Sequence, residues 1–369
     1  MNGGTGIVVA AYRRSRTSFA VAMATVIGLC SSAPAARAQN PGDRKAPPSP
    51  ISQTELVSRL SHGLDSLVQT GQFSGVVTLA RDGSLVFHRA YGMADRGANR
   101  ANDTETAFNI GSINKIFTQI AIMQLRDSGK IELDSTLAKY WPDYPNKEVA
   151  RKVTIRQLLR HTSGIGGNIF APPASGRRND IRSLQDYLPL FVNTPMQFEP
   201  GTKNAYSNAG YVVLGLLVQR VSGEDYYTYV KSHILDPAGM KRTASYAVDS
   251  LPPNTAIGYS TGGPGATSHG PISPNTAELP GRGSSAGGGY STSDDLVAFI
   301  QALRTHRIPS GPPAGIGAAG GSGGLNADVE GDLPGGYDLV VLANLDPPAA
   351  ERVATMVREW LGVKLEFTK

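Results

Sequence analysis

The chain is organised around one stretch of sequence, FNIGSINKIFTQ, at residues 108–119. Ser112 and Lys115 stand three residues apart in it, and apolar residues such as Ile116 and Ile120 follow at a helical spacing. Residues three apart share one face of a helix, so the spacing predicts that Ser112 opens a buried helix, with Lys115 one turn further on the same side. Free backbone N–H groups at a helix start suit an oxyanion. A nearby lysine can accept the serine proton if its surroundings lower its pKa.

A structural alternative stands beside this chemical interpretation. The Ser-x-x-Lys pattern is short enough to occur by chance in a chain of 369 residues. In that case Ser112 is an N-cap and Lys115 is a solvated helix residue. The chemical interpretation therefore needs partners for Ser112 elsewhere in the chain.

The N-terminus has the pattern of an export signal. Arginines between Arg13 and Arg16 precede an apolar run from Phe19 to Cys30 that is too short to span a bilayer, and Ala36-Arg37-Ala38 is a small-x-small cleavage site. We expect a signal peptide at residues 1–38, a flexible leader at 39–52, and a periplasmic or secreted protein. An uncleaved membrane anchor is the alternative.

Charge and cysteine content limit the possible partners. The net charge is +5, but residues 1–38 hold four arginines and no acidic residue, so the remainder carries +1. Without a run of Lys and Arg, nucleic acid is an unexpected partner. Cys30 is the sole cysteine, so the mature chain would have no disulfide or thiol chemistry.

The order of hydrophobic patterns predicts an α+β fold. A helix is expected over residues 52–68, then a β-hairpin whose strands at 74–80 and 85–92 flank Asp82-Gly83. The middle of the chain has helical spacing, and the C-terminal part has a strand at 337–344 and a helix at 349–360. We expect one domain at 53–369: an antiparallel sheet built from both chain ends, flanked by helices, with a mainly helical insertion at about 130–285.

A candidate partner for Ser112 is the Tyr206-Ser207-Asn208 segment at the head of another predicted helix. It could bring a phenol for acid–base chemistry and an amide into the same cleft. Tyr144-Pro145-Asn146 has the same pattern, but it directly follows Pro142 and is interpreted as a turn that stops a helix.

With these partners, the chain from Phe73 to its C-terminus resembles the serine β-lactamase and penicillin-binding-protein family. The nearest members are class C β-lactamases, low-molecular-weight D-Ala-D-Ala carboxypeptidases and their esterase relatives. The resemblance rests on five ordered segments: FSGVV at 73–77, NIGSINK at 109–115, LLRHTSGI at 158–165, YSNAGY at 206–211 and AGGGYST at 286–292.

The resemblance implies a role for each matched residue. Ser112 is the acylated nucleophile and Lys115 is its proton partner. Tyr206 passes a proton to the leaving group and helps to activate the deacylating water. Asn208 holds Lys115 and the substrate amide, and the Ser112 N–H is one oxyanion donor. No cofactor is implied, and the six histidines show no metal spacing.

The chain departs from the family at its third motif. The family has Lys or His, a small residue and Gly on the strand beside the cleft, and the candidate here is GAAGGSGGLNA at 317–327. Ala318 then stands where the cation is expected. Gly320, Gly321 and Ser322 are the expected substrate-binding residues, with the Gly321 N–H as second oxyanion donor. The run between the helix at Asp295 and this strand is also short for the family, and one expected strand is not recognisable.

Without that cation, ester hydrolysis is favoured over β-lactamase or carboxypeptidase activity, although Arg282 or Arg307 could replace it. We expect an exported serine hydrolase acting on an ester, a β-lactam or a D-amino-acid peptide, with peptides derived from peptidoglycan among the candidate substrates. The alternative is a family member that has lost turnover and acts in binding or regulation.

His161 is interpreted as a structural residue that orders a helix end. The substrate and the oligomeric state stay open.

Overall fold

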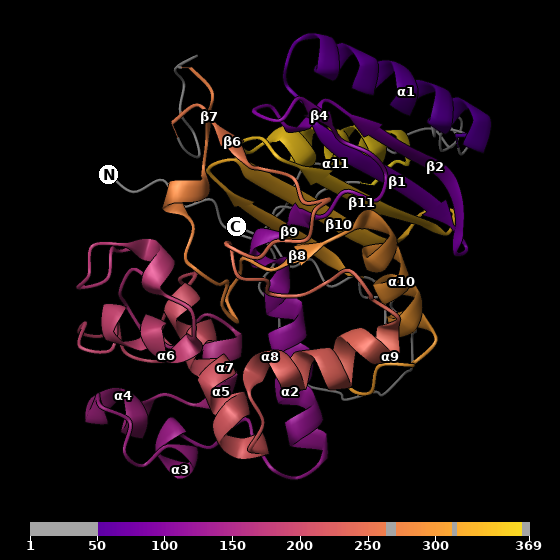
Figure 1. The fold of residues 1–369 in the computed structure, drawn as a ribbon. Helices are drawn as coiled ribbons and strands as arrows, with labels where there is room; N and C mark the ends of the chain where they lie inside the picture. The colour runs from indigo at the N-terminus through magenta and orange to yellow at the C-terminus, as the bar shows by residue number, and fades with distance from the viewer. Residues whose placement is uncertain (1–50, 263–270, 312–315, 364–369) are drawn as a thin grey trace, which may run out of the picture.

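A computed structural model describes residues 51–262, 271–311 and 316–363 (Figure 1). The expected signal peptide at 1–38 lies outside the described residues, as does the leader up to residue 50. In the described ranges no helix is both long enough and apolar enough to cross a membrane.

A five-stranded antiparallel sheet forms the centre of the described part of the chain, in the order β2-β1-β11-β10-β9. The N-terminal hairpin pairs with the C-terminal strand, from Gly75 opposite Ala343 to Arg81 opposite Tyr337. The expected sheet built from both chain ends is therefore confirmed. Its strands are β1 (Gly75–Arg81), β2 (Ser84–Tyr91), β9 (Gly317–Ser322), β10 (Leu325–Leu333) and β11 (Tyr337–Ala343).

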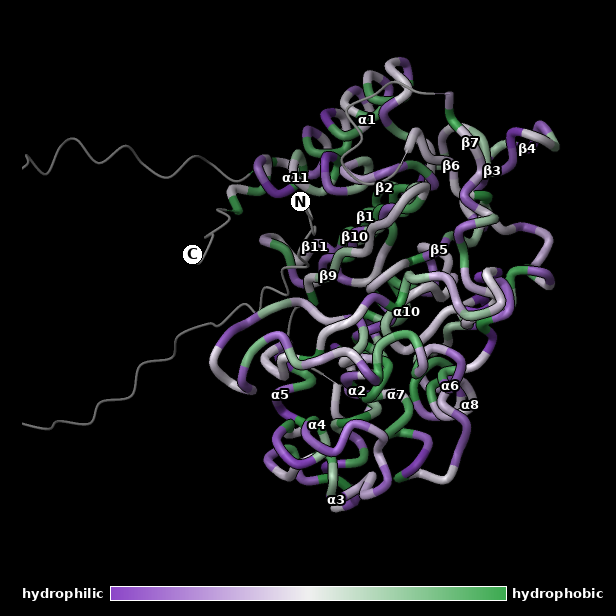
Figure 2. The backbone as a smooth tube through the Cα atoms, turned by 90° about the vertical axis from the view of Figure 1, so that its left-hand side faces the viewer, coloured by the Kyte–Doolittle hydropathy of each residue, from purple (hydrophilic) through white to green (hydrophobic). Residues whose placement is uncertain are grey.

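Helices cover both faces of this sheet (Figure 1). On one face lie α1 (Gln53–Gln69) and α11 (Ala349–Trp360), and on the other lie α2 (Asn114–Asp127) and α10 (Ser293–Arg304). Hydrophilic and hydrophobic residues alternate along α1 and α11, as expected for helices with one buried side (Figure 2). Strand side chains alternate between the two cores: Leu342 packs on the α2 side and Leu339 on the α1 side.

The helical part of the chain lies below the sheet in Figure 1. Its main element is α7 (Asn208–Ser222), which is buried over most of its length because its sequence is apolar on nearly every face. The shorter helices around it are α3 (Leu137–Tyr140), α4 (Lys147–Lys152), α5 (Ile155–Leu159), α6 (Leu184–Tyr187), α8 (Tyr226–Val230) and α9 (Asp236–Ala238).

Two elements differ from the sequence expectation. Strand β10 was not predicted from the sequence, and it pairs with both β9 and β11. The sequence predicts a helix from a Thr154 N-cap to a Gly164 C-cap, but α5 ends at Leu159, because His161 adopts a left-handed conformation (φ 57°). The chain then turns, and Thr162 N–H donates to the Gln157 carbonyl.

Short strand pairs complete the described structure. They are β3 (Met93–Asp95) with β4 (Arg100–Ala101), β5 (Phe108–Asn109) with β8 (Tyr290–Ser291), and β6 (Tyr259–Ser260) with β7 (Ser273–Pro274). The β5–β8 pair ends immediately before Gly111 and thereby positions the Ser112 segment.

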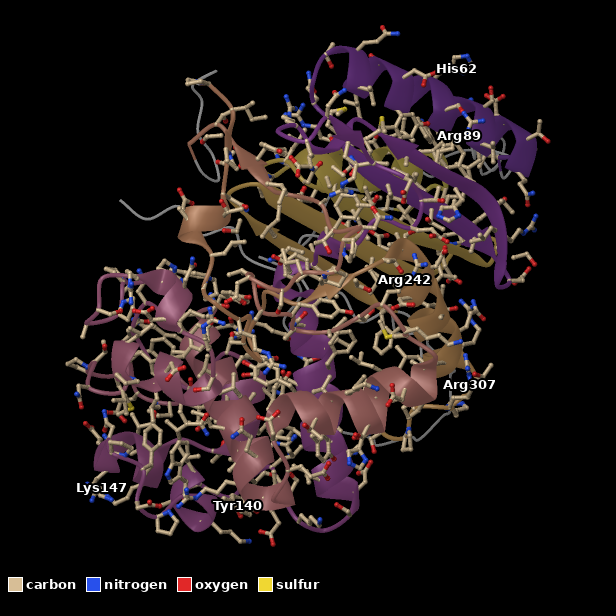
Figure 3. The ribbon with its side chains drawn as sticks, viewed as in Figure 1. His62, Arg89, Tyr140, Lys147, Arg242 and Arg307 are labelled. Carbon is tan, nitrogen blue, oxygen red and sulfur yellow. The ribbon has the colours of Figure 1, made fainter. Side chains whose placement is uncertain are left out.

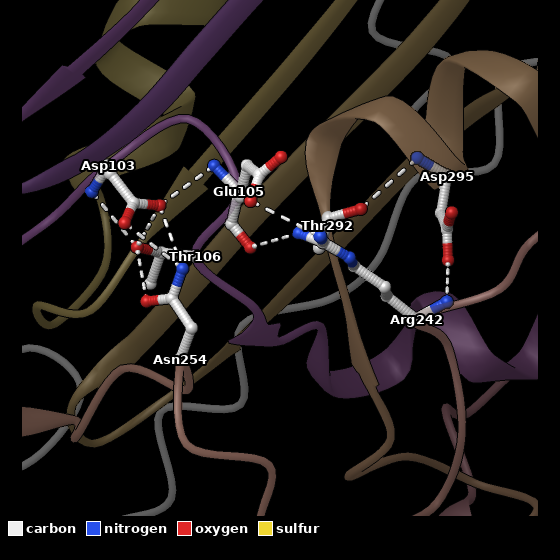
Figure 4. Close-up of polar contacts among 7 residues, drawn as sticks. All are labelled: Asp103, Glu105, Thr106, Arg242, Asn254, Thr292 and Asp295. Carbon is white, nitrogen blue, oxygen red and sulfur yellow. Dashed lines mark hydrogen bonds and ion pairs between the residues drawn. The ribbon is translucent and has the colours of Figure 1, made fainter.

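Polar contacts fix this segment to the start of α10 (Figure 4). Arg242 donates its backbone N–H to Asp295 at 2.7 Å and its side chain to Glu105 at 3.2 Å. Thr292 caps α10 by accepting from the Asp295 N–H. The chain entering β5 and the first turn of α10 are therefore joined through one arginine.

Candidate active site

Ser112 lies in the 3₁₀ turn Gly111–Ile113, which leads directly into α2 at Asn114. The helix expected to open at Ser112 thus begins slightly later. Gly111 has φ 51°, and a β-carbon there would lie 2.9 Å from Leu325 and 3.2 Å from the Gly321 nitrogen. Glycine is required here because strand β9 approaches the backbone of the turn.

Lys115 is 5% exposed and reaches three polar atoms. Its Nζ lies 3.1 Å from Ser112 Oγ and 2.8 Å from Asn208 Oδ1, and it also contacts the Ala286 carbonyl. Because none of these partners is a carboxylate, burial lowers the pKa of Lys115 well below its usual 10.5. A neutral amine has two N–H groups for Asn208 and Ala286, and a lone pair that accepts the Ser112 hydroxyl proton.

Tyr206 lies on the other side of the serine oxygen and donates its hydroxyl to Ser112 Oγ at 2.9 Å. Burial raises the pKa of Tyr206, so the phenol is neutral in the resting site. Lys115 Nζ lies 4.8 Å from the centre of the Tyr206 ring and 5.4 Å from that of Tyr211. These ring faces favour the ammonium that forms when Lys115 takes a proton.

His161 supports the start of α7 and is not in hydrogen-bonding contact with Ser112. Its Nδ1 accepts the Ser207 N–H at 3.1 Å, and its ring stacks on Tyr211 and tilts against Tyr206. Burial, and then the charge of Lys115, lower the pKa of His161 to about 4. A neutral ring that accepts at Nδ1 carries its proton on Nε2. The contacts agree with the structural role expected for this residue.

The rejected Tyr144-Pro145-Asn146 segment lies elsewhere, as expected. Tyr144 is buried with its ring 4.9 Å from that of Trp141, and Asn146 caps α4 by accepting from the Val149 N–H. Its residues have structural partners, and Tyr206 is the tyrosine at Ser112.

The residues expected in the third motif lie on edge strand β9, beside the Ser112 turn. A β-carbon on Gly320 would lie 2.3 Å from the Ile110 carbonyl oxygen and 2.9 Å from the Ser112 nitrogen, so glycine allows the strand to touch the turn. Gly321 and Ser322 line the same cavity as Ser112. Ala318 is buried in the core on the α2 side and places no cation near the nucleophile.

Neither arginine considered as a replacement cation lines this cavity among the described residues. Arg282 donates to the Ser245 carbonyl and covers the Tyr227 ring at 3.6 Å. Arg307 lies on the outside of the molecule beyond α10 (Figure 3).

The cavity next to Ser112 has a volume of about 880 Å³. Two loops, at 169–180 and 275–288, form much of its wall. They contribute apolar side chains, including Ile169, Phe170 and Leu279, and also the charged Arg178. A local pattern could not reveal these residues, because their common feature is a shared position in space.

Comparison with known proteins gives the same family by sequence. The sequence profile of the family described as Beta-lactamase matches residues 61–353. PbpX of Bacillus subtilis (strain 168), named as a penicillin-binding protein, is 32% identical over 231 residues, which cover 63% of this chain and 55% of PbpX. Esterase EstB of Burkholderia gladioli is 28% identical over 348 residues, covering 85% of this chain and 86% of EstB. The match thus spans about half the length of PbpX and most of EstB.

A solved structure shows the same fold. The penicillin-binding protein from Bacillus halodurans superposes with a TM-score of 0.68 at 28% identity, covering 80% of this chain and 99% of that one. The match includes the sheet and the helical part, because nearly the whole of the second protein is covered.

Proposed function

We propose that this chain, which belongs to the β-lactamase family of serine hydrolases, hydrolyses esters through an acyl-enzyme at Ser112. The observation that carries the proposal is the position of Ser112 Oγ, which lies 3.1 Å from Lys115 Nζ and 2.9 Å from the Tyr206 hydroxyl. One neighbour can remove the serine proton while the other can supply a proton to the leaving group.

The proton transfers balance over one cycle. In acylation, Ser112 gives its proton to the neutral Lys115 as Oγ bonds to the carbonyl carbon, and Tyr206 gives its proton to the departing alkoxide. In deacylation, water gives a proton to the Tyr206 phenolate and attacks the ester. The bond to Oγ breaks, and Ser112 recovers its proton from Lys115. A phenol of raised pKa is a weak acid, so it suits a basic leaving group and returns as a strong base.

The negative charge on the carbonyl oxygen needs donors in the cleft. The N–H groups of Ser112 and Gly321 are assigned to this role, supported by the contact of β9 with the Ser112 turn. Gly321 and Ser322 would also contact the substrate, since both line the cavity. Asn208 would hold Lys115 through its 2.8 Å contact and meet the substrate with its amide nitrogen.

The absence of a cation at Ala318 supports an ester substrate. A charge-assisted hydrogen bond to a carboxylate beside the scissile bond is worth about 1.5–3 kcal/mol, or roughly 10–150-fold in affinity. This chain lacks that contribution at Ala318, so cephalosporins and D-Ala-D-Ala peptides should lose the advantage that the carboxylate gives them. The high coverage of the match to an esterase supports the same choice.

Two experiments test the proposal. A fluorophosphonate probe should label the protein at Ser112, and Ser112→Ala should abolish both labelling and turnover, with Ser128→Ala as a serine control on the far end of α2. Labelling that survives in Ser112→Ala would disprove the assignment. A panel of p-nitrophenyl butyrate, nitrocefin and a D-Ala-D-Ala peptide should show the ester turned over best, and efficient nitrocefin hydrolysis would overturn the substrate class.

The missing cation also supports the second candidate, a binding or regulatory protein with weakened turnover. In that case a β-lactam probe would label Ser112 without release, and no ester in the panel would turn over.

We also propose export with cleavage after Ala38, since residues 13–38 have the pattern of a signal peptide. N-terminal sequencing of the exported protein should read Gln39 first.

A further inference from the structure

The part of the cavity wall that the two loops form carries charged residues that the proposed reaction does not use. Arg177, Arg178 and Asp180 lie on the loop at 169–180, and Glu278 lies on the opposite loop. Arg177 is 79% exposed and pairs with Asp180 at 3.3 Å, as an ordinary surface ion pair does. Arg178 is half-buried and has different surroundings.

The contacts of Arg178 leave its charge without an acidic hydrogen-bond partner. Its Nε donates to the Glu278 carbonyl at 2.8 Å and its Nη1 to the Ala171 carbonyl at 3.1 Å. In the described part of the chain its Nη2 is enclosed by protein and has no hydrogen-bond partner. The side chain of Glu278 attracts the guanidinium through space without bonding to it.

An enclosed guanidinium with free N–H groups is unfavourable unless an acceptor reaches it. Burial accordingly lowers the pKa of Arg178, although arginine stays protonated at any ordinary pH. The contact with the Glu278 carbonyl holds the two loops together, but a neutral carbonyl does not require a charged partner for that purpose. The unused charge therefore points to a ligand.

We propose that Arg178 binds a carboxylate on the substrate, remote from the scissile bond, so that the enzyme takes esters with a free acid group at their far end. Half-esters of dicarboxylic acids are the simplest such substrates. The inference rests on the proposed function, because it places this carboxylate in the cavity that Ser112 opens into. It also differs from the family's third motif, whose cation position is filled by Ala318, a core residue that does not line the cavity.

Phe170 explains how the guanidinium can be reached. Its ring centre lies 5.8 Å from the Arg178 guanidinium carbon, and the side chain is 56% exposed. An exposed ring can rotate away without breaking packing in the core, and this movement opens the guanidinium to the cavity. The planar fork of arginine then suits both oxygens of a carboxylate.

The test uses the full chain and matched ester pairs. The mono-p-nitrophenyl esters of succinic, glutaric and adipic acids carry the charge at increasing distances, and their methyl esters at the far end are neutral counterparts. We expect one acid in the series to exceed its methyl ester in kcat/KM. Arg178→Gln should lower that value by about 10- to 150-fold, mainly through KM, and change the neutral esters by less than about threefold.

The controls separate charge from loop structure. Arg182→Gln removes an equal charge four residues further along the chain. Arg182 pairs with Asp249 at 2.5 Å and does not line the cavity, so this variant should keep the preference for the acid over its methyl ester. Arg178→Lys should recover part of the preference. Equal losses for charged and neutral esters in Arg178→Gln would show that Arg178 only clamps the loops. A preference lost in Arg177→Gln but kept in Arg178→Gln would also overturn the proposal.

A binding measurement distinguishes this failure from failure of the proposed function. In Ser112→Ala, calorimetric titration with monomethyl glutarate should show binding that weakens as salt is raised and disappears when Arg178→Gln is added. Binding that survives the added Arg178→Gln would refute the site. Hydrolysis that survives in Ser112→Ala would refute the proposed reaction and leave the binding result to decide on Arg178.

Discussion

At the scale of single residues, the site joins three side chains whose roles depend on one another. Lys115 and Tyr206 contact the same serine oxygen from different sides. The pairing of Ser112 and Lys115 could be predicted because both lie in one local helical pattern. Tyr206 is separated from Ser112 by 94 positions, so its prediction needed the Tyr-x-Asn pattern and the family resemblance in addition to local spacing.

The shared oxygen predicts non-additive losses. Lys115→Ala and Tyr206→Phe should each lower kcat by at least about 10²-fold, because each removes a proton carrier of the same catalytic cycle. The double variant should lose much less than the product of the single losses. Steady-state kinetics on p-nitrophenyl butyrate would measure this, with Tyr140→Phe on the surface as control (Figure 3). Turnover close to wild type in Tyr206→Phe would rule out its part in the relay.

The lowered pKa of Lys115 predicts the pH profile. The active form has the neutral amine, so kcat/KM should rise with pH through the folded pKa of Lys115, at a pH well below 10.5. Lys115→Arg keeps the positive charge and cannot release it, so activity should fall by at least about 10²-fold at every pH. A pH series of kcat/KM checks both statements. A profile that rises only near pH 10.5 would mean that Lys115 stays charged in the resting enzyme.

At the scale of elements, β9 and the Ser112 turn are held together through glycine contacts. Gly320→Ala should push the strand from the turn, since the new carbon would lie 2.3 Å from the Ile110 oxygen. We expect a loss of about 1–3 kcal/mol in stability from overpacking. A displacement near 1 Å at the nucleophile should also cost roughly 10²-fold in kcat/KM.

Gly63→Ala in α1 is the matched control for this change. Its new carbon would meet the flexible end of Met356 at 3.3 Å, far from the site, and alanine favours a helix. Thermal unfolding and kinetics on both variants would compare them. Unchanged activity in Gly320→Ala would show that β9 does not determine the geometry of the cleft.

The elements also show which parts of the fold a sequence can reveal. Helix α1 and the β1–β2 hairpin were predicted because their caps, turn and apolar spacing are local. Strand β10 was missed because its polar residues are paired by distant ones: Asn326 accepts from the Ala350 N–H, and Glu330 binds Arg358 of α11. Arg178 was missed for a similar reason, since its position in the cavity depends on the packing of two long loops.

At the scale of the whole molecule, the central sheet is shared by two hydrophobic cores, so both should unfold together. Leu342→Ala opens a cavity on the α2 side and Leu339→Ala opens one on the α1 side, away from Ser112. Each should cost about 2–5 kcal/mol. Activity and far-UV circular dichroism should be lost at a single temperature in both variants. Activity that outlasts the sheet signal in Leu339→Ala would show that the two sides unfold separately.

The pairing of β1 with β11 has a consequence for the timing of synthesis. Gly75 leaves the ribosome long before Ala343, its partner across the ladder, so the sheet cannot close until almost the entire domain has been translated. Until then β1 has an unpaired edge that can join other molecules.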